Sequence, residues 1–151
     1  MGMRRVKLVI DSDLINVPLV GMAMNRLCSL IPLSEVDSLN IELCVVEAVT
    51  NSIKHSFSGR AGHEVEVVFT LSADELTIDI YDTGLALDTG LLERADIAAI
   101  EHDISDIENI AEKGRGLPII KEIMDRVSYK SEGGKNCLTL KKKLPSRSNN
   151  S

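Results

Sequence analysis

Two polar side chains one helical turn apart are the residues of this chain best suited to chemistry. Glu47 and Asn51 lie in the segment 42–57, whose apolar residues follow the spacing of an amphipathic helix. A carboxylate at the edge of an apolar face can act as a general base, and an amide oxygen is a hard ligand that suits Mg²⁺. A solvated helix face carries the same residue types, so this helix alone leaves both interpretations open. The apolar stripe is expected to comprise Leu43, Val46, Thr50, Ile53 and Phe57.

A carboxylate followed by a glycine forms the second candidate, in the run Asp82-Thr-Gly84-Leu-Ala86. Strand parity points Asp82 toward the core, because it continues the alternating apolar row of the segment 76–82. A carboxylate aimed inward needs a donor, and the exocyclic amine of a purine base would suit it. Gly84 would let the backbone pass close to a ligand. An ordinary turn after a strand is the alternative interpretation.

The third candidate is the run Gly114-Arg115-Gly116, directly before a predicted helix. Glycines expose backbone N–H groups, a helix N-terminus attracts anions, and Arg115 adds positive charge for a polyphosphate. The run is neither a P-loop nor a Rossmann fingerprint, and a plain helix start remains possible. Between this run and Ala86, residues 87–113 lack strand alternation. A connection of that length, running from one candidate motif to the next, indicates a lid over a bound nucleotide.

The surrounding elements indicate an α+β two-layer sandwich, with helices on one face of a mixed, mostly antiparallel sheet. Alternation and helical spacing predict strands at 4–10, 64–71, 76–82, 127–129 and 136–142, and helices at 14–30, 36–57 and 117–127. Ser12 or Asp13 is expected to cap the first helix. We expect one domain over residues 1–144 and a disordered tail over residues 145–151.

The composition narrows the class of partner. A net charge of −6 and an aromatic content of 3% argue against a broad nucleic-acid or membrane-surface footprint. No apolar run approaches the length of a membrane span. The three cysteines lack CxxC spacing and are expected to be buried free thiols in a reducing cytoplasm, namely Cys28, Cys44 and Cys137.

The order and separation of these motifs resemble the Bergerat-fold (GHKL) ATPases, also called histidine-kinase-like ATPases. Within them, the run Glu47-Ala-Val-Thr-Asn51, followed by Lys54-His55, is similar to the anti-sigma-factor serine/threonine kinases, the RsbW-like group. The helix that begins near Gly116 and ends in Met-Asp125 resembles that group too. The resemblance covers about residues 6–142.

The resemblance implies a role for each candidate residue. Glu47 would be the general base, and Asn51 would bind the Mg²⁺ ion that is held on the ATP phosphates. Asp82 would recognise adenine, and Gly84 would lie beneath the base. Gly114 and Gly116 would be the phosphate-loop glycines, and Arg115 would contact a phosphate. It assigns no definite role to Lys54 or His55. Ala86 stands where the family has a second glycine, so a methyl group is expected to crowd the backbone near the nucleotide.

The implied function is that of an anti-sigma factor with ATP-dependent serine/threonine kinase activity. It would phosphorylate a STAS-type antagonist protein, sequester a sigma factor, and form a homodimer. A non-catalytic ATP-binding module for partner switching is the alternative. The short chain disfavours an ATPase domain of a larger machine. A complete sensor histidine kinase is also disfavoured, because the sequence contains no phospho-acceptor histidine box.

Overall fold

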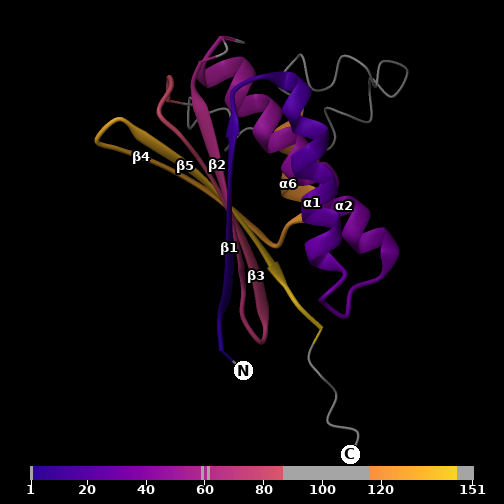
Figure 1. The fold of residues 1–151 in the computed structure, drawn as a ribbon. Helices are drawn as coiled ribbons and strands as arrows, with labels where there is room; N and C mark the ends of the chain where they lie inside the picture. The colour runs from indigo at the N-terminus through magenta and orange to yellow at the C-terminus, as the bar shows by residue number, and fades with distance from the viewer. Residues whose placement is uncertain (1, 59, 61, 87–115, 146–151) are drawn as a thin grey trace, which may run out of the picture.

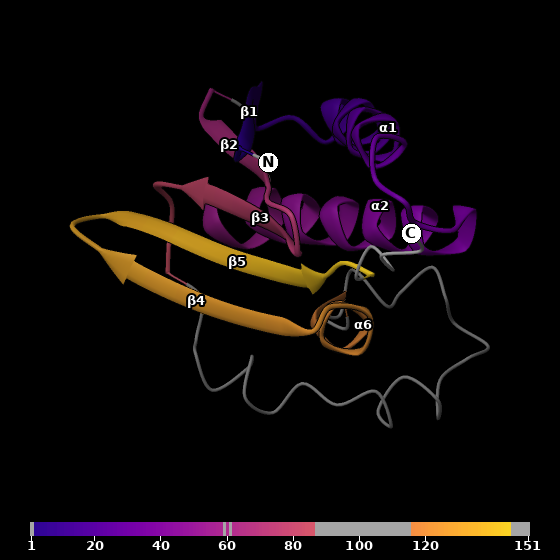
Figure 2. The same cartoon turned by 90° about the horizontal axis from the view of Figure 1, so that it is seen from below.

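Helices cover one face of a single sheet, so the molecule is built in two layers (Figures 1 and 2). The structure, a computed structural model, describes residues 2–58, 60, 62–86 and 116–145. Within these residues, three α-helices pack on a five-stranded sheet, and one aliphatic core fills the space between the layers. The predicted α+β two-layer sandwich is confirmed.

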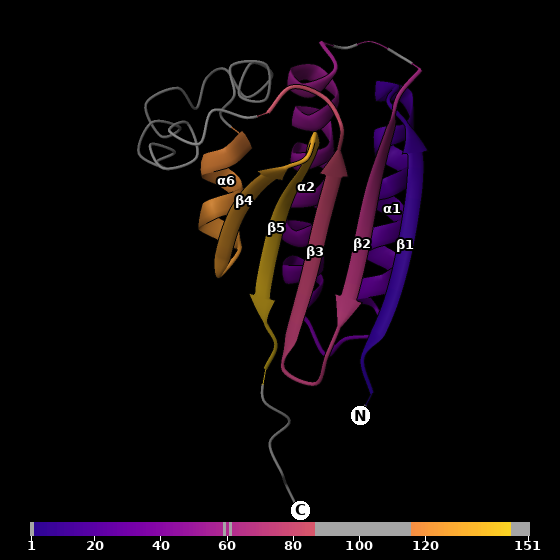
Figure 3. The same ribbon diagram turned by 90° about the vertical axis from the view of Figure 1, so that its left-hand side faces the viewer.

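The sheet has the strand order β1-β2-β3-β5-β4, and every pairing of the described strands is antiparallel (Figure 3). Its strands are β1 (Arg4–Asp11), β2 (Glu64–Leu71), β3 (Glu75–Asp82), β4 (Arg126–Glu132) and β5 (Lys135–Lys143). The last strand lies between β3 and β4, so the chain returns to the middle of the sheet. Asp82, at the end of β3, is thereby set opposite Asn136 of β5.

Alternation along the strands places one row of side chains against the helices. In β3 the inward residues Leu76, Ile78 and Ile80 are buried, and the residues between them are partly exposed. This is the two-residue period expected of a sheet with one covered face. The turn between β4 and β5 has positive φ angles at Gly133 and Gly134, of 58° and 78°. Two such residues suit a tight hairpin, because they match the twist of the strands.

The helical layer consists of α1 (Val17–Cys28), α2 (Glu35–Asn51) and α6 (Gly116–Ile123). A 3₁₀ turn, η1 (Leu14–Asn16), precedes α1, and its N-cap Asp13 accepts a hydrogen bond from the Ile15 amide. A π turn, η2 (Ser52–Ser56), continues α2. Ser34 caps α2 by accepting a bond from the Asp37 amide. Both α1 and α6 contact α2.

The last predicted helix is too long at its C-terminal end. It was expected over residues 117–127, but α6 ends at Ile123 and Val127 belongs to β4. Hydrogen bonds of Asp125 to β5 explain the difference: its amide donates to the Lys141 carbonyl, and its carboxylate accepts from the Lys143 amide. These bonds draw the chain into the sheet before the apolar spacing ends.

The buried face of α2 differs from the predicted stripe. Leu43 is 40% exposed, and the buried apolar positions of α2 are Ile41, Cys44, Val45, Ala48 and Val49. Ile53 and Phe57 are buried as predicted, but they lie in or just after the π turn. The buried face continues from α2 into the π turn at steps of three and four residues, through Ala48, Val49, Ser52 and Ile53. The predicted stripe was wrong in α2 itself, because Leu43, Val46 and Thr50 flank the buried positions.

The cysteines are free, as predicted, but only two of them are buried. Burial raises the pKa of the Cys28 thiol to about 11 and that of Cys44 to about 12. Cys137 is partly exposed, because strand parity places it on the face of β5 away from the helices. None of the helices described here has the length and apolar character needed to cross a membrane.

Candidate functional site

The helix α2 and its π turn carry two pairs of polar side chains toward the same region. Glu47 and Asn51 are one turn apart at the end of α2, and Ser52 and Ser56 lie in the π turn after them. Both serines reach the end of β3. The Oγ atoms of Ser52 and Ser56 donate hydrogen bonds to Oδ2 of Asp82, at 2.7 and 2.9 Å.

Asp82 points inward, as strand parity predicts, and is 7% exposed. Its second oxygen, Oδ1, accepts bonds from the Gly84 amide at 3.1 Å and from Nδ2 of Asn136 at 2.7 Å. With the two serine hydroxyls, this carboxylate has four protein donors. These four bonds fix the direction of the carboxylate.

Gly84 lies directly against the π turn. A β-carbon at this position would clash with the carbonyl oxygen of Ser56 and lie 2.5 Å from its carbonyl carbon. The amide of the next residue, Leu85, donates to that same carbonyl oxygen at 2.9 Å. Glycine is therefore required because two backbone segments touch here. Ala86, where the resemblance implies a second glycine, is exposed.

Two buried oxygens near the end of α2 lack hydrogen bonds. Among the described residues, neither Oε2 of Glu47 nor Oδ1 of Asn51 has a partner. Gly116, the first residue of α6, lies beside both: a β-carbon there would be 2.6 Å from Oε2 of Glu47 and 3.4 Å from Nδ2 of Asn51. The positive end of the α6 dipole is therefore next to two unpaired acceptors.

These two oxygens fit a divalent cation. Buried acceptors without donors are costly, and a cation or a donor group would compensate for them. The described residues hold no cluster of three or more His, Cys, Asp or Glu side chains. Mg²⁺ does not need such a cluster, because it is commonly held by one or two protein oxygens, water and substrate phosphates. Oδ1 of Asn51 thus fits the kind of oxygen ligand that Mg²⁺ takes when a phosphate ligand completes its coordination.

The electrostatic environment of Glu47 suits a base. Burial raises the pKa of its carboxyl above the ordinary value, and the positive charge of Lys54 partly opposes the shift. A raised pKa strengthens a carboxylate as a proton acceptor. Lys54 thus acts on Glu47 through its charge, whereas His55 is exposed.

The raised pKa also affects stability. Because burial favours the protonated form of Glu47 in the folded state, its folded pKa lies above its unfolded pKa. The ionised carboxylate therefore destabilises the fold at neutral pH, and this cost is lost as the pH falls through the raised pKa. We expect Glu47→Gln to raise the melting temperature at neutral pH, with the difference shrinking toward acid pH. Thermal denaturation of both proteins across that range tests this, and parallel curves would contradict it.

The structure places five of the seven predicted site residues in two neighbouring groups, linked through Ser52, which follows Asn51 in the chain and bonds to Asp82. One group is Glu47, Asn51 and Gly116, and the other is Asp82 and Gly84. The predicted phosphate-loop residues Gly114 and Arg115, and the predicted lid over residues 87–113, lie outside the described residues. So does most of the predicted disordered tail, of which only Pro145 is described.

Sequence reasoning missed three residues of the site, namely Ser52, Ser56 and Asn136. The serines had a local signal, since four-residue spacing puts them on one face of the helix that already carried Asn51. Asn136 had none, because 54 residues separate it from Asp82. Only the pairing of β3 with β5 places the two residues opposite each other.

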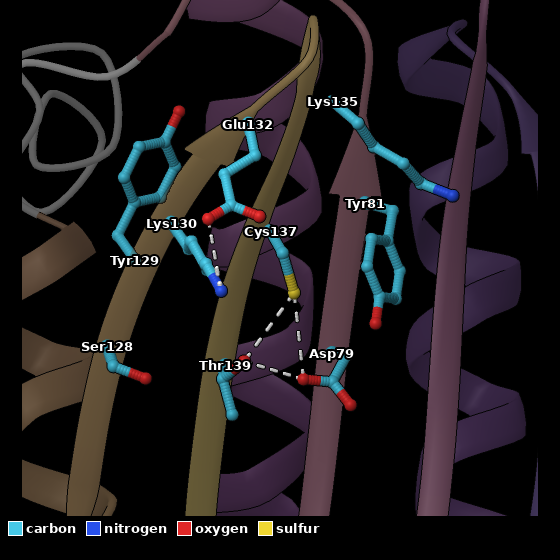
Figure 4. A pocket seen from close by; sticks show the side chains of 9 residues that line it. All are labelled: Asp79, Tyr81, Ser128, Tyr129, Lys130, Glu132, Lys135, Cys137 and Thr139. Atoms are coloured by element: carbon cyan, nitrogen blue, oxygen red, sulfur yellow. Dashed lines mark hydrogen bonds and ion pairs between the residues drawn. The ribbon is translucent and has the colours of Figure 1, made fainter.

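The opposite face of the sheet is a separate surface. A shallow hollow of about 560 Å³ there is lined by side chains from β3, β4 and β5 (Figure 4). In it, Oγ1 of Thr139 donates to Oδ1 of Asp79 at 2.6 Å, and the ammonium of Lys135 lies 4.8 Å from the ring centroid of Tyr81. None of the predicted site residues contributes to this hollow.

Comparison with known proteins identifies a matching family model and similar bacterial proteins. The family model of the histidine kinase-like ATPase domain matches residues 10–142. A serine-protein kinase RsbW of Bacillus cereus (strain ZK / E33L) is 26% identical over 138 residues, which cover 91% of this chain and 84% of that protein. An anti-sigma F factor of Clostridium acetobutylicum is 29% identical over 111 residues, 74% of this chain and 71% of the relative.

A solved structure shares the fold. One chain of the SiaB-SiaC complex from Pseudomonas aeruginosa superposes with a TM-score of 0.53 at 13% sequence identity. The match covers 91% of this chain and 89% of that one. At this identity the likeness concerns the fold alone.

Proposed function

Because the chain belongs to the histidine kinase-like ATPase family and is RsbW-like within it, we propose that it is an ATP-dependent serine/threonine protein kinase. Its substrate is an anti-sigma-factor antagonist of the STAS type, and it also sequesters a sigma factor in the cytoplasm. The similar proteins named serine-protein kinase and anti-sigma F factor support both parts of this proposal.

One observation carries the catalytic part of the proposal. Oε2 of Glu47 and Oδ1 of Asn51 are buried acceptors without partners among the described residues, beside the first residue of α6. A purely structural pair at this depth would be expected to have donors. An unpaired carboxylate beside an unpaired amide oxygen supports a site that handles a cation and a proton.

The nucleotide would be held at its two ends by different groups. Asn51 would hold Mg²⁺ through Oδ1, and the amides at the start of α6 would face the phosphates. Asp82 would accept from the amino group of adenine, with Gly84 beneath the base. When bound, Mg²⁺ neutralises charge that develops on the transferred phosphoryl group.

Glu47 is the proposed general base. Its carboxylate takes the proton of the acceptor hydroxyl while the oxygen of that serine or threonine forms its bond to the γ-phosphorus, and ADP leaves. Phosphoryl transfer requires mainly positioning and charge stabilisation, so one base and one metal ligand are an adequate protein contribution.

Transfer of radiolabelled γ-phosphate tests the proposal directly. The full chain is incubated with ATP, Mg²⁺ and purified STAS-type antagonist proteins, and label on the antagonist is measured. We expect label on a serine or threonine of at least one antagonist. ATP binding without transfer to any of them would support the alternative, a non-catalytic partner-switching module in which nucleotide controls only binding.

Replacing Asn51 by leucine, which has a similar size but no acceptor, tests the metal role. We expect the variant to lose the Mg²⁺-dependent part of its ATP affinity, roughly 10- to 100-fold, because a charge-assisted contact contributes about 1.5–3 kcal/mol. Calorimetric titration of ATP with Mg²⁺ and with EDTA measures this. Asn25→Leu is the control, since Asn25 is a partly buried asparagine of α1 bonded to Glu42. Equal Mg²⁺ dependence in wild type and Asn51→Leu would exclude Asn51 as the ligand.

A further inference from the structure

One buried side chain joins the two parts of the site that would contact a nucleobase. Asn136 of β5 is 2% exposed. Its Nδ2 donates to Oδ1 of Asp82 at 2.7 Å and to the Gly84 carbonyl at 2.9 Å. One amide group therefore holds both the carboxylate and the glycine, although the two belong to a strand end and to the turn after it.

The orientation of this amide is fixed from the other side. Ser131 of β4 lies opposite Asn136 in the hairpin, and its hydroxyl donates to Oδ1 of Asn136 at 2.7 Å. The other end of the carboxamide faces a carboxylate and the Gly84 carbonyl, which only accept, so that end is the NH₂ group and the end beside Ser131 is the oxygen. The NH₂ group must then face Asp82.

The side-chain amide of Asn136 also contacts a third acceptor. Nδ2 of Asn136 lies 3.5 Å from the Leu85 carbonyl, in addition to its two shorter bonds. The same amide group therefore holds the turn after β3 at both Gly84 and Leu85 while it stays bonded to Asp82.

We propose that Asn136 is the positioning residue that gives the site its preference for a 6-aminopurine nucleotide over a purine that lacks the exocyclic amine. The proposal rests on the proposed function, in which Asp82 accepts from the base. A carboxylate whose direction is already fixed requires the ligand to present its donor at one place. Without Asn136, Oδ1 of Asp82 keeps a single donor, the Gly84 amide, so the acceptor is less firmly directed.

The test compares the affinities of ATP and of purine riboside 5′-triphosphate, which lacks only the amino group. Asn136→Leu removes the donor, and Asn136→Thr keeps one hydroxyl in a residue that favours strands. Thr139→Val is the matched control, because it removes a bond between the same two strands, from Thr139 to Asp79, on the opposite face of the sheet (Figure 4). Melting temperatures are recorded for all four proteins.

We expect Asn136→Leu to lower the ratio of ATP affinity to purine riboside triphosphate affinity about 5- to 10-fold, the equivalent of one hydrogen bond. Asn136→Thr should give an intermediate affinity ratio. If the leucine variant does not fold, the threonine variant alone is compared with the wild type. Thr139→Val should leave the ratio unchanged even where it lowers the melting temperature.

A ratio in the Asn136 variants that stays at the wild-type value, or rises, overturns the proposal and leaves Asn136 a structural role only. That result would leave the kinase proposal intact, because wild-type ATP binding is measured in the same series. A wild-type protein that binds neither nucleotide would instead refute the proposed function, and with it this inference.

Discussion

Glu47→Gln is expected to abolish phosphate transfer to the antagonist while leaving ATP binding in place. Glutamine keeps the size of the side chain but cannot accept the hydroxyl proton, and loss of a general base lowers the rate by roughly 10²- to 10⁴-fold. ATP binding should persist, since Asn51, Asp82 and the start of α6 are unchanged. The measurement is single-turnover transfer of labelled phosphate at saturating ATP, with ATP affinity determined in parallel.

Glu42→Gln provides the matched control for that experiment. Glu42 lies on the same helix, partly buried, and accepts a bond from Asn25 at 3.4 Å, so the control makes the same chemical change outside the site. It should transfer phosphate at the wild-type rate. Because Glu47→Gln is also expected to be more stable than wild type at neutral pH, unfolding could not explain its inactivity. Wild-type transfer by Glu47→Gln would remove Glu47 from the base role. Sigma-factor regulation that survives without any transfer would favour the non-catalytic module.

Gly84→Ala is expected to be the most damaging single-methyl substitution in the site. The added carbon would meet the Ser56 carbonyl group and lie 2.6 Å from Cβ of the same residue. These atoms belong to the backbone and the first side-chain atom of the π turn, so they cannot move aside without disturbing the bonds from Ser56 to Asp82 and from Leu85 to Ser56. We expect a loss of about 1–3 kcal/mol in the free energy of unfolding, typical of overpacking, and loss of ATP binding.

Gly116→Ala is the informative comparison for Gly84→Ala. Its added carbon would meet mainly Oε2 of Glu47, which is the end of a flexible side chain that can turn away. Denaturant unfolding should therefore show a much smaller change for Gly116→Ala, although phosphate transfer should fall because Glu47 is displaced. Equal stability losses in the two variants would show that the contact between Gly84 and the π turn is no less yielding than that between Gly116 and the Glu47 side chain.

Much of this site could be predicted because short-range geometry controls it. Glu47 and Asn51 are neighbours in any helix that contains them, because four residues make about one turn. Asp82 points inward in any strand that also buries Ile78 and Ile80, because side chains alternate. Gly84 was predicted to let the backbone pass close to a ligand, and Gly116 to expose backbone N–H groups to phosphate. Each lies against other residues of the site, and both ligand roles stay predictions.

The predictions that failed depended on a distant partner or on which face of a helix is buried. Ser52 and Ser56 bond to Asp82, which lies 30 and 26 residues further along the chain, and the stripe expected in α2 lay beside its buried face. The helix that begins at Gly116 ended early because Asp125 bonds to β5, a strand that comes later in the chain.

The amino-acid sequence by itself determined most of the local elements, the inward direction of Asp82, the adjacency of Glu47 and Asn51, and the family. Each of these depends on residue types and spacings within a few turns of helix or a few residues of strand, where backbone geometry leaves little choice. Only the tertiary structure decided how the local motifs make one site. The return of β5 beside β3 set Asn136 against Asp82, and the packing of α6 on α2 set Gly116 against Glu47. Such contacts depend on strand register and helix packing over the whole domain, which spacing along the chain does not encode.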